Sequence, residues 1–245
     1  MSYSANLGFL FTEYALPEAI RAAATAGFDA VECHWPFDVP TADVKAALAE
    51  TGLKMLSLNT VPGRAGDHGL AALPHRKEEA RAAIDQAVAY AHAIDAGAVH
   101  VMAGCSQGPE AHRTFIENLR YAVSVAAGTT LLIEPLNRYD VPGYFLQSTD
   151  QAVAIIEEVG ASNVKLMFDC YHVQLMEGDL SHRLTRLLPM IGHIQFAGVP
   201  ARGRPDEGEV NYDHVFTHIR DIGYTAPLGA EYRPNGPTDA TLGWM

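Results

Sequence analysis

The stretches Thr-Leu-Leu-Ile-Glu at residues 130–134 and Val-Lys-Leu-Met-Phe-Asp at residues 164–169 decide the fold class. Each is a short apolar run typical of a buried strand, and each ends on a carboxylate. Residues 149–159 between them have the apolar spacing of an amphipathic helix, which Thr149 and Asp150 open. A strand, a helix and a second strand in succession predict two parallel strands of one sheet.

The same alternation extends along the chain in both directions. We expect eight strands, at residues 5–11, 28–33, 53–58, 98–102, 130–134, 164–169, 193–197 and 228–232. Seven helical stretches lie between them, at residues 17–26, 41–50, 75–95, 110–127, 149–159, 178–188 and 212–222. Such repetition over 245 residues predicts a single (β/α)₈ TIM-barrel domain spanning residues 1–245.

An open, doubly wound sheet is the alternative architecture. It usually has fewer strands, and neither of the glycine-rich phosphate-binding motifs follows the first predicted strand. Gly63, Gly66 and Gly69 match neither motif. The pattern therefore favours the barrel.

The charge balance limits the class of partner. The chain has 29 Asp+Glu against 17 Lys+Arg, a formal net charge of −12, and no run of basic residues. Nucleic-acid-binding proteins usually carry a basic field, so we expect no nucleic-acid partner, although one local arginine can still hold a small anion. The first residues lack a signal-peptide pattern and no long apolar run occurs, so we expect a cytoplasmic protein without a membrane partner.

Four successive predicted strands end on oxygen-bearing side chains. These are Glu134, Asp169, Gln195 and Glu231. In a TIM barrel the active site lies at the carboxyl ends of the strands, so these side chains would meet at one mouth. A lone carboxylate at a strand end is most often a helix cap or a solvated loop residue, but three buried together need a shared charge partner. A divalent cation that prefers oxygen ligands, Mg²⁺ or Mn²⁺, fits this set.

Three further residues near these strand ends are candidates for contact with a ligand. His172 falls in a predicted loop after Asp169, where a substrate contact and a structural hydrogen bond are both reasonable. His193 shares a strand face with Gln195, and we interpret it as a core histidine rather than a ligand. The long loop at residues 198–209 contains Arg202, whose planar guanidinium could bind an anionic group.

These motifs together resemble the hydroxypyruvate isomerase family, which belongs to the xylose isomerase-like barrels. The resemblance covers essentially the whole chain, in order. Its motifs are Ser-Ala-Asn-Leu at 4–7, Ile-Glu-Pro-Leu-Asn at 133–137, Asp-Val-Pro-Gly at 140–143, Asp-Cys-Tyr-His-Val-Gln at 169–174, Met-Glu-Gly at 176–178, Gly-His-Ile-Gln at 192–195, Gly-Glu-Val-Asn-Tyr at 208–212 and Glu-Tyr-Arg-Pro at 231–234.

The resemblance implies metal ligation by the same four residues and proton transfer by Glu134 and Glu231. It implies substrate contacts at His172 and Arg202. The chain departs from the family at Gly198, where many relatives have Asp, at Arg204, where an acidic residue is common, and in the short segment 104–110. These positions border the mouth of the barrel, so they bear on the identity of the substrate more than on the reaction type.

The implied activity is an aldose–ketose isomerisation of a small anionic hydroxy-oxo acid, hydroxypyruvate to tartronate semialdehyde, through a cis-enediolate. In this hypothesis the cation stabilises the developing negative charge, and each glutamate serves as base in one direction and acid in the other. Arg202 would bind the substrate carboxylate.

Several alternatives remain open at this stage. A close relative, 2-oxotetronate isomerase, shares nearly all the motifs, and other sugar-acid isomerases or epimerases use the same barrel. A dehydratase of the inosose type would use the same metal and base. A DNA-repair endonuclease is disfavoured by the acidic charge and by the lack of a histidine-rich ligand set. The sequence also leaves open which divalent ion is bound and whether the chain forms a homo-oligomer.

Overall fold

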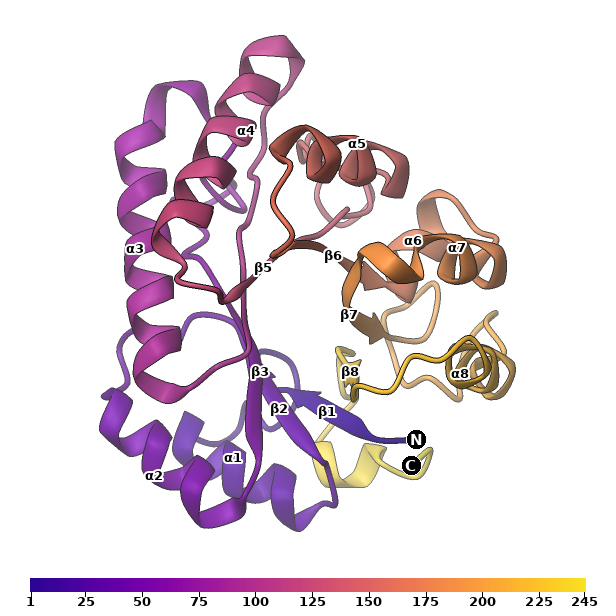
Figure 1. The fold of residues 1–245 in the computed structure, drawn as a ribbon. Coiled ribbons are helices and arrows are strands. Elements are labelled where there is room, and N and C mark those ends of the chain that lie inside the picture. Colours follow the sequence, from indigo (N-terminus) through magenta and orange to yellow (C-terminus); the bar gives the residue numbers. More distant parts are fainter.

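Eight parallel strands close into a barrel, as predicted (Figure 1). The computed structural model describes residues 1–245. Each strand pairs with the next in sequence, and β1 pairs with β8 to complete the cylinder. The strands are β1 (Tyr3–Asn6), β2 (Ala30–Cys33), β3 (Lys54–Asn59), β4 (Ala98–His100), β5 (Thr130–Ile133), β6 (Val164–Asp169), β7 (Ile191–Phe196) and β8 (Leu228–Ala230).

The α-helices surround this barrel, and the two chain ends lie close together beside β1 (Figure 1). There are eight, one more than predicted. They are α1 (Leu16–Thr25), α2 (Thr41–Thr51), α3 (Lys77–Ile94), α4 (Gly108–Val125), α5 (Thr149–Val159), α6 (Cys170–Met176), α7 (Leu180–Leu187) and α8 (Tyr212–Asp221), with short 3₁₀ turns η1 (Pro74–Arg76), η2 (Leu188–Met190) and η3 (Thr238–Thr241).

The helix α5 occupies the range that its sequence predicts. Ser148 caps its first turn by accepting a hydrogen bond from the backbone N–H of Gln151 at 3.2 Å. Gly160 ends it in the left-handed region at φ 74°. Local capping signals therefore decide where this helix begins and ends.

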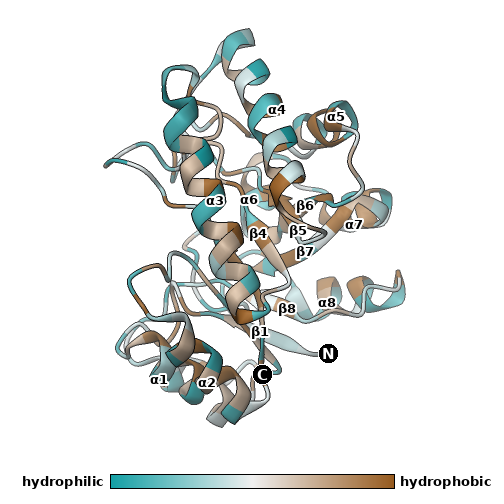
Figure 2. Cartoon of the chain, turned by 60° about the vertical axis from the view of Figure 1, so that its left-hand side comes forward, coloured by the Kyte–Doolittle hydropathy of each residue, from teal (hydrophilic) through white to brown (hydrophobic).

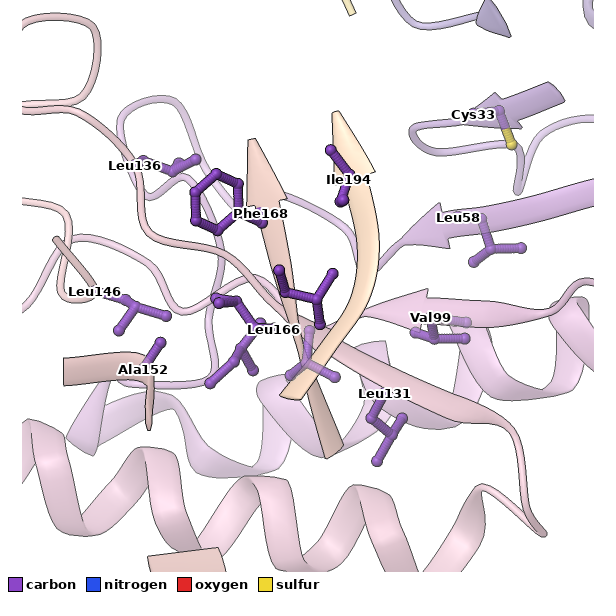
Figure 3. Close-up of a cluster of buried hydrophobic side chains, with 14 of the residues drawn as sticks. Cys33, Leu58, Val99, Leu131, Leu136, Leu146, Ala152, Leu166, Phe168 and Ile194 are labelled. Atoms are coloured by element: carbon purple, nitrogen blue, oxygen red, sulfur yellow. The ribbon is translucent and has the colours of Figure 1, made fainter. Parts of the chain in front are cut away.

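Strand alternation separates the core from the barrel interior. Leu131, Leu166 and Ile194 belong to the large apolar core between the strands and the helices, and Figure 3 shows them on neighbouring strands. Leu132 and Met167, next to them in sequence, belong to a separate small cluster. Because successive strand side chains point to opposite faces, this second set lies inside the barrel.

The outer helices are amphipathic. In α3 the buried positions recur every three or four residues, which places one apolar face against the barrel. Figure 2 shows hydrophilic and hydrophobic segments alternating along α3 and α4. None of the helices is both long and apolar enough to cross a membrane.

The first strand is shorter than predicted. It ends at Asn6, whereas the sequence pattern extends it to residue 11. The Asn6 side chain accepts a hydrogen bond from the N–H of Gly8 at 2.9 Å, and the Asn6 carbonyl accepts one from Leu10 at 2.8 Å. An asparagine that bonds the backbone two residues ahead turns the chain, so the apolar residues after it pack in a turn.

The residues after β6 are also different from the prediction. His172 was expected in a loop, but it lies in helix α6, which begins directly after the strand. Asp169 ends the strand and also caps this helix, because its Oδ1 accepts the N–H of Tyr171 at 2.8 Å. The helix holds the His172 side chain in one orientation.

Candidate functional site

The four strand-end residues lie together at the carboxyl end of the barrel. Each occupies the inward-facing side of its strand, and none is more than 6% exposed. Asp169 and Gln195 are register partners on β6 and β7. One oxygen each of Glu134 and Asp169 and a ring nitrogen of His172 lie within 4.8 Å of one another.

Three of these four residues have a buried oxygen without a hydrogen bond. The atoms are Oε1 of Glu134, Oδ2 of Asp169 and Oε1 of Gln195. An unpaired buried acceptor costs about 1–3 kcal/mol, and more when it is charged. Carboxylate and amide oxygens at one end of the barrel are the type of ligand that a hard divalent cation prefers. The residues present therefore fit a Mg²⁺ or Mn²⁺ site.

Both oxygens of Glu231 have partners. Its Oε1 accepts a hydrogen bond from Nδ2 of Asn6 at 2.8 Å and lies 3.3 Å from Nε2 of His34. Its Oε2 accepts one from Nη2 of Arg202 at 2.5 Å. Burial alone would raise the pKa of Glu231, but the neighbouring Arg202 guanidinium lowers it to about 2. This glutamate is therefore ionised in the protein without a metal.

The pKa values of Glu134 and Asp169 are raised, in contrast to that of Glu231. Burial, together with the negative charges of Glu231 and Asp169, raises the pKa of Glu134 well above its usual range. Burial also raises the pKa of Asp169 to about 7, although Arg202 opposes the shift. The metal-free site therefore retains protons near neutral pH, which a cation would have to displace.

We expect Mn²⁺ to bind with a pH-dependent affinity. A proton on Glu134 or Asp169 competes with the cation, so the affinity should fall by up to about tenfold for each pH unit below 7 and each proton displaced. Calorimetric titration at pH 6, 7 and 8 measures this dependence. An affinity that is constant over this range would contradict the protonated state of the site.

His172 is oriented as a hydrogen-bond donor. Its Nδ1 accepts the backbone N–H of Asn137 at 3.0 Å and lies 2.7 Å from Nδ2 of the same residue. Burial lowers its pKa to about 3, so the ring is neutral and carries its proton on Nε2. That atom lies 3.6 Å from Oδ2 of Asp169 and 4.0 Å from Oε1 of Glu134. A protonated Nε2 cannot ligate a metal but can donate to a substrate oxygen.

Arg202 lies beside Glu231 and is 9% exposed. Its guanidinium carbon lies 4.6 Å from the ring centre of Phe9 and 5.1 Å from that of Tyr171. While Nη2 bonds Glu231, Nη1 has no partner closer than Asp140 Oδ2 at 4.0 Å. Nη1 is thus the part of the guanidinium that a substrate carboxylate can use.

Gly198 and Arg204, which depart from the family pattern, lie in the loop after β7 and differ in their structural roles. A side chain at Gly198 would collide with the carbonyl oxygens of Arg204 and Glu207, because the loop after β7 folds back over this residue. Arg204 forms an ion pair with Asp206 and is not among the residues that line the cavity beside the site. The glycine is therefore required by this loop, and Arg204 is not a residue of the site.

A cavity of about 240 Å³ opens beside these groups. Its size is below the range of about 300–1,000 Å³ usual for drug-sized ligands, which favours a small substrate. Its lining also contains side chains to which the sequence analysis assigned no role, including His100, Asn59 and Arg233. His100 is 2% exposed, its Nε2 has no hydrogen-bond partner, and burial lowers its pKa to about 4. A polar residue in the middle of the otherwise apolar predicted strand at residues 98–102 was the signal that could have identified it.

Glu32 is a further residue near the site for which no role was predicted. It lies on β2 inside the barrel and is 1% exposed. Its Oε2 accepts hydrogen bonds from Nε2 of His193 at 3.0 Å and Nε2 of Gln195 at 2.8 Å. Burial alone would lower the pKa of His193, but the Glu32 charge raises it. His193 therefore pairs with Glu32 in the interior, in keeping with its interpretation as a core histidine.

Comparison with known proteins gives full-length similarities. The family described as xylose isomerase-like TIM barrel matches residues 20–245. The 2-oxo-tetronate isomerase of Cupriavidus necator is 44% identical over 99% of this chain and 96% of its own length. The hydroxypyruvate isomerase of Escherichia coli K12 is 38% identical over 100% of this chain and 98% of its own. A Brucella melitensis crystal structure named AP endonuclease, family 2, superposes with a TM-score of 0.95 at 38% identity, covering 100% of this chain and 98% of that one.

Proposed function

Because the chain belongs to the xylose isomerase-like TIM-barrel family and is an isomerase, we propose that it interconverts hydroxypyruvate and 2-hydroxy-3-oxopropanoate (tartronate semialdehyde). A divalent cation, Mg²⁺ or Mn²⁺, would be held by Glu134, Asp169, Gln195 and Glu231. The observation that carries this proposal is the group of buried oxygens without hydrogen bonds on the first three of these residues. When bound, the cation would supply positive charge that stabilises negative charge developing on the substrate oxygens.

The two glutamates carry the proton transfers in this proposal. One removes a proton from C3 of hydroxypyruvate, the carbon that bears the hydroxyl, and a cis-enediolate forms. The other delivers a proton to C2, while the C3 hydroxyl proton leaves its oxygen and the oxygen at C2 gains one. The product is the aldehyde, 2-hydroxy-3-oxopropanoate, which is an isomer of hydroxypyruvate. In the reverse reaction the glutamates exchange roles, which a carboxyl group allows because it can act as acid or base.

His172 and Arg202 orient the substrate. The Nε2–H of His172 is directed at Glu134 and Asp169 and can donate to a substrate oxygen lying between them. Nη1 of Arg202 offers a charged hydrogen bond to the substrate carboxylate. Because Arg202 supplies a local positive charge, an anionic substrate can bind although the chain has a net charge of −12.

We expect Arg202→Ala to raise the KM for carboxylate substrates by about 10- to 100-fold, since a hydrogen bond between charged groups contributes about 1.5–3 kcal/mol. The KM for a neutral ketose of similar size should change much less. Arg233→Ala is the matched comparison. Arg233 also lines the cavity, but it forms no ion pair. If Arg202→Ala raised the KM equally for the acid and the neutral substrate, Arg202 would not bind the substrate carboxylate.

The runner-up is 2-oxotetronate isomerisation, which the 44% identical relative favours by its name. The two acids share the carboxylate, the ketone and the neighbouring hydroxyl, so they would use the same four ligands and two glutamates. The DNA substrate that the name of the Brucella protein suggests is opposed by the net charge of −12 and by the small cavity.

The deciding experiment is a substrate panel in deuterated water, with cation removed and then restored. The expected result is cation-dependent isomerisation of hydroxypyruvate or 2-oxotetronate, with deuterium incorporated at the carbon that receives the proton. Loss of water from the substrate would indicate a dehydratase. Turnover without any cation would contradict the proposed chemistry.

A further inference from the structure

Four polar side chains are buried inside the barrel next to Gln195. They come from β1, β2, β3 and β7, and we call them the Glu32 cluster: Ser4, Glu32, Ser57 and His193. The interior of a TIM barrel is usually filled by branched apolar residues, and burying a carboxylate there costs several kcal/mol unless it is well paired. None of these side chains has a task in the proton transfers. Their presence therefore needs a separate reason.

The hydrogen bonds of Glu32 determine the orientation of Gln195. Oε1 of Glu32 accepts from Oγ of Ser4 at 3.0 Å, and its Oε2 accepts from both His193 and Gln195. A carboxylate offers only acceptors, so the end of the Gln195 amide that faces it must be the NH₂ group. The carbonyl oxygen must then face away from Glu32, and this is the oxygen that is buried without a hydrogen bond.

Gly229 on β8 leaves the space that this arrangement requires. It is the register partner of Gln195 on one side and of Ser4 on the other. A Cβ at this position would collide with Oε1 of Glu32 and would lie 2.8 Å from Cγ of Gln195. The backbone of β8 thus has no side chain where the carboxylate and the amide meet.

We propose that Glu32 is a positioning residue that fixes the Gln195 amide with its carbonyl oxygen toward the cation site and makes that oxygen a better ligand. A carboxylate that accepts the amide N–H draws electron density toward the carbonyl oxygen, as hydrogen-bond partners of metal ligands generally do. Without Glu32 the amide could turn and present NH₂, which cannot ligate a cation. This inference rests on the proposed function only in that it assumes the same cation site.

Mn²⁺ affinity of the purified full-length protein, measured from free Mn²⁺ by electron paramagnetic resonance, is the test. We expect Glu32→Gln to weaken binding by about 10- to 100-fold, the usual effect of removing such a partner. The glutamine side chain introduced at position 32 carries no charge. It can form a hydrogen bond with the Gln195 amide whichever way that amide is turned. Glu177→Gln is the matched control, because it removes a partly buried carboxylate bonded to Thr149 and Arg183, away from the cation site. It should change the affinity less than twofold.

A double-mutant cycle distinguishes positioning from a general structural role. If Glu32 acts through Gln195, Glu32→Gln should change the affinity less than twofold in a Gln195→Ala background. An equal loss in both backgrounds, or no loss in the wild-type background, would overturn the inference. If Glu32→Gln does not fold, Glu32→Asp replaces it in the same cycle, since the shorter side chain keeps the charge but withdraws the acceptor oxygen from the Gln195 amide.

The wild-type titration separates this inference from the proposed function. If the wild-type protein binds Mn²⁺ but isomerises no acid of the panel, the proposed function is wrong. The double-mutant cycle then still tests the role of Glu32. Wild-type protein that binds no Mn²⁺ overturns both.

Discussion

Replacing either glutamate by glutamine, Glu134→Gln or Glu231→Gln, lowers kcat by about 10²- to 10⁴-fold, the contribution usual for a general acid or base. Glutamine keeps the size and a carbonyl oxygen for the cation, but it can neither accept nor return the substrate proton. The two variants should be impaired in both directions of the reaction, because each glutamate takes part in both. Steady-state rates measured forward and backward, at saturating cation, test this expectation.

The control for this experiment is Glu209→Gln. Glu209 is an exposed carboxylate in the loop after β7, with one long contact of 3.4 Å to Gln174. It should retain kcat within about twofold, since exposed side chains without strong partners contribute little. A variant of Glu134 or Glu231 that folds, binds Mn²⁺ and keeps near-normal kcat would refute the two-carboxylate scheme.

Removal of divalent cations should abolish turnover, and Mn²⁺ or Mg²⁺ should restore it. The protein should also lose thermal stability, because a ligand that binds only the folded state at about 100 times its Kd stabilises it by about 2.7 kcal/mol. Activity and Tm measured after chelation and after readdition report the two effects separately. In Asp169→Asn, which lacks one of the three unpaired oxygens, the Tm should respond much less to added cation.

Persistent turnover in the chelated protein would contradict the role of the cation. A Tm that does not respond to Mn²⁺ in the wild-type protein would contradict its binding to the folded state. The first result concerns the chemistry and the second concerns the site, so the two failures can be told apart.

The barrel and the strand-end residues were predictable because both follow from local periodicity. The apolar runs around Leu131 and Leu166 alternate between the core and the barrel interior, and this alternation carries Glu134 and Asp169 to the inward face. Parallel strands bring their carboxyl ends to one mouth. A single sequence therefore contained enough information to select these positions.

Helix α6 and the residues it holds were harder to predict. Asp169 is at once the last residue of a strand and the cap of the next helix, so the sequence contains no separate loop between them. A helix of seven residues is also unstable by itself and depends on packing. The orientation of His172 follows from tertiary contacts with Asn137, which no local pattern reveals.

The remaining features depend on contacts between residues far apart in the sequence. Arg202 lies in a long loop at φ 54°, and its ion pair with Glu231 requires the folded barrel. Glu32 is a charged residue between Val31 and Cys33 in a predicted strand, and its partner Gln195 lies 163 residues away in the sequence. Period-two alternation could place Glu32 inside the barrel, but it could not identify what Glu32 contacts.

The central claim is that Glu134, Asp169, Gln195 and Glu231 hold one cation. Anomalous diffraction from crystals containing Mn²⁺ tests it most directly. We predict a single strong peak at the carboxyl end of the barrel, about 2.0–2.4 Å from one oxygen of each of the four side chains. A peak bound by other residues, or no peak at saturating Mn²⁺, would contradict the claim.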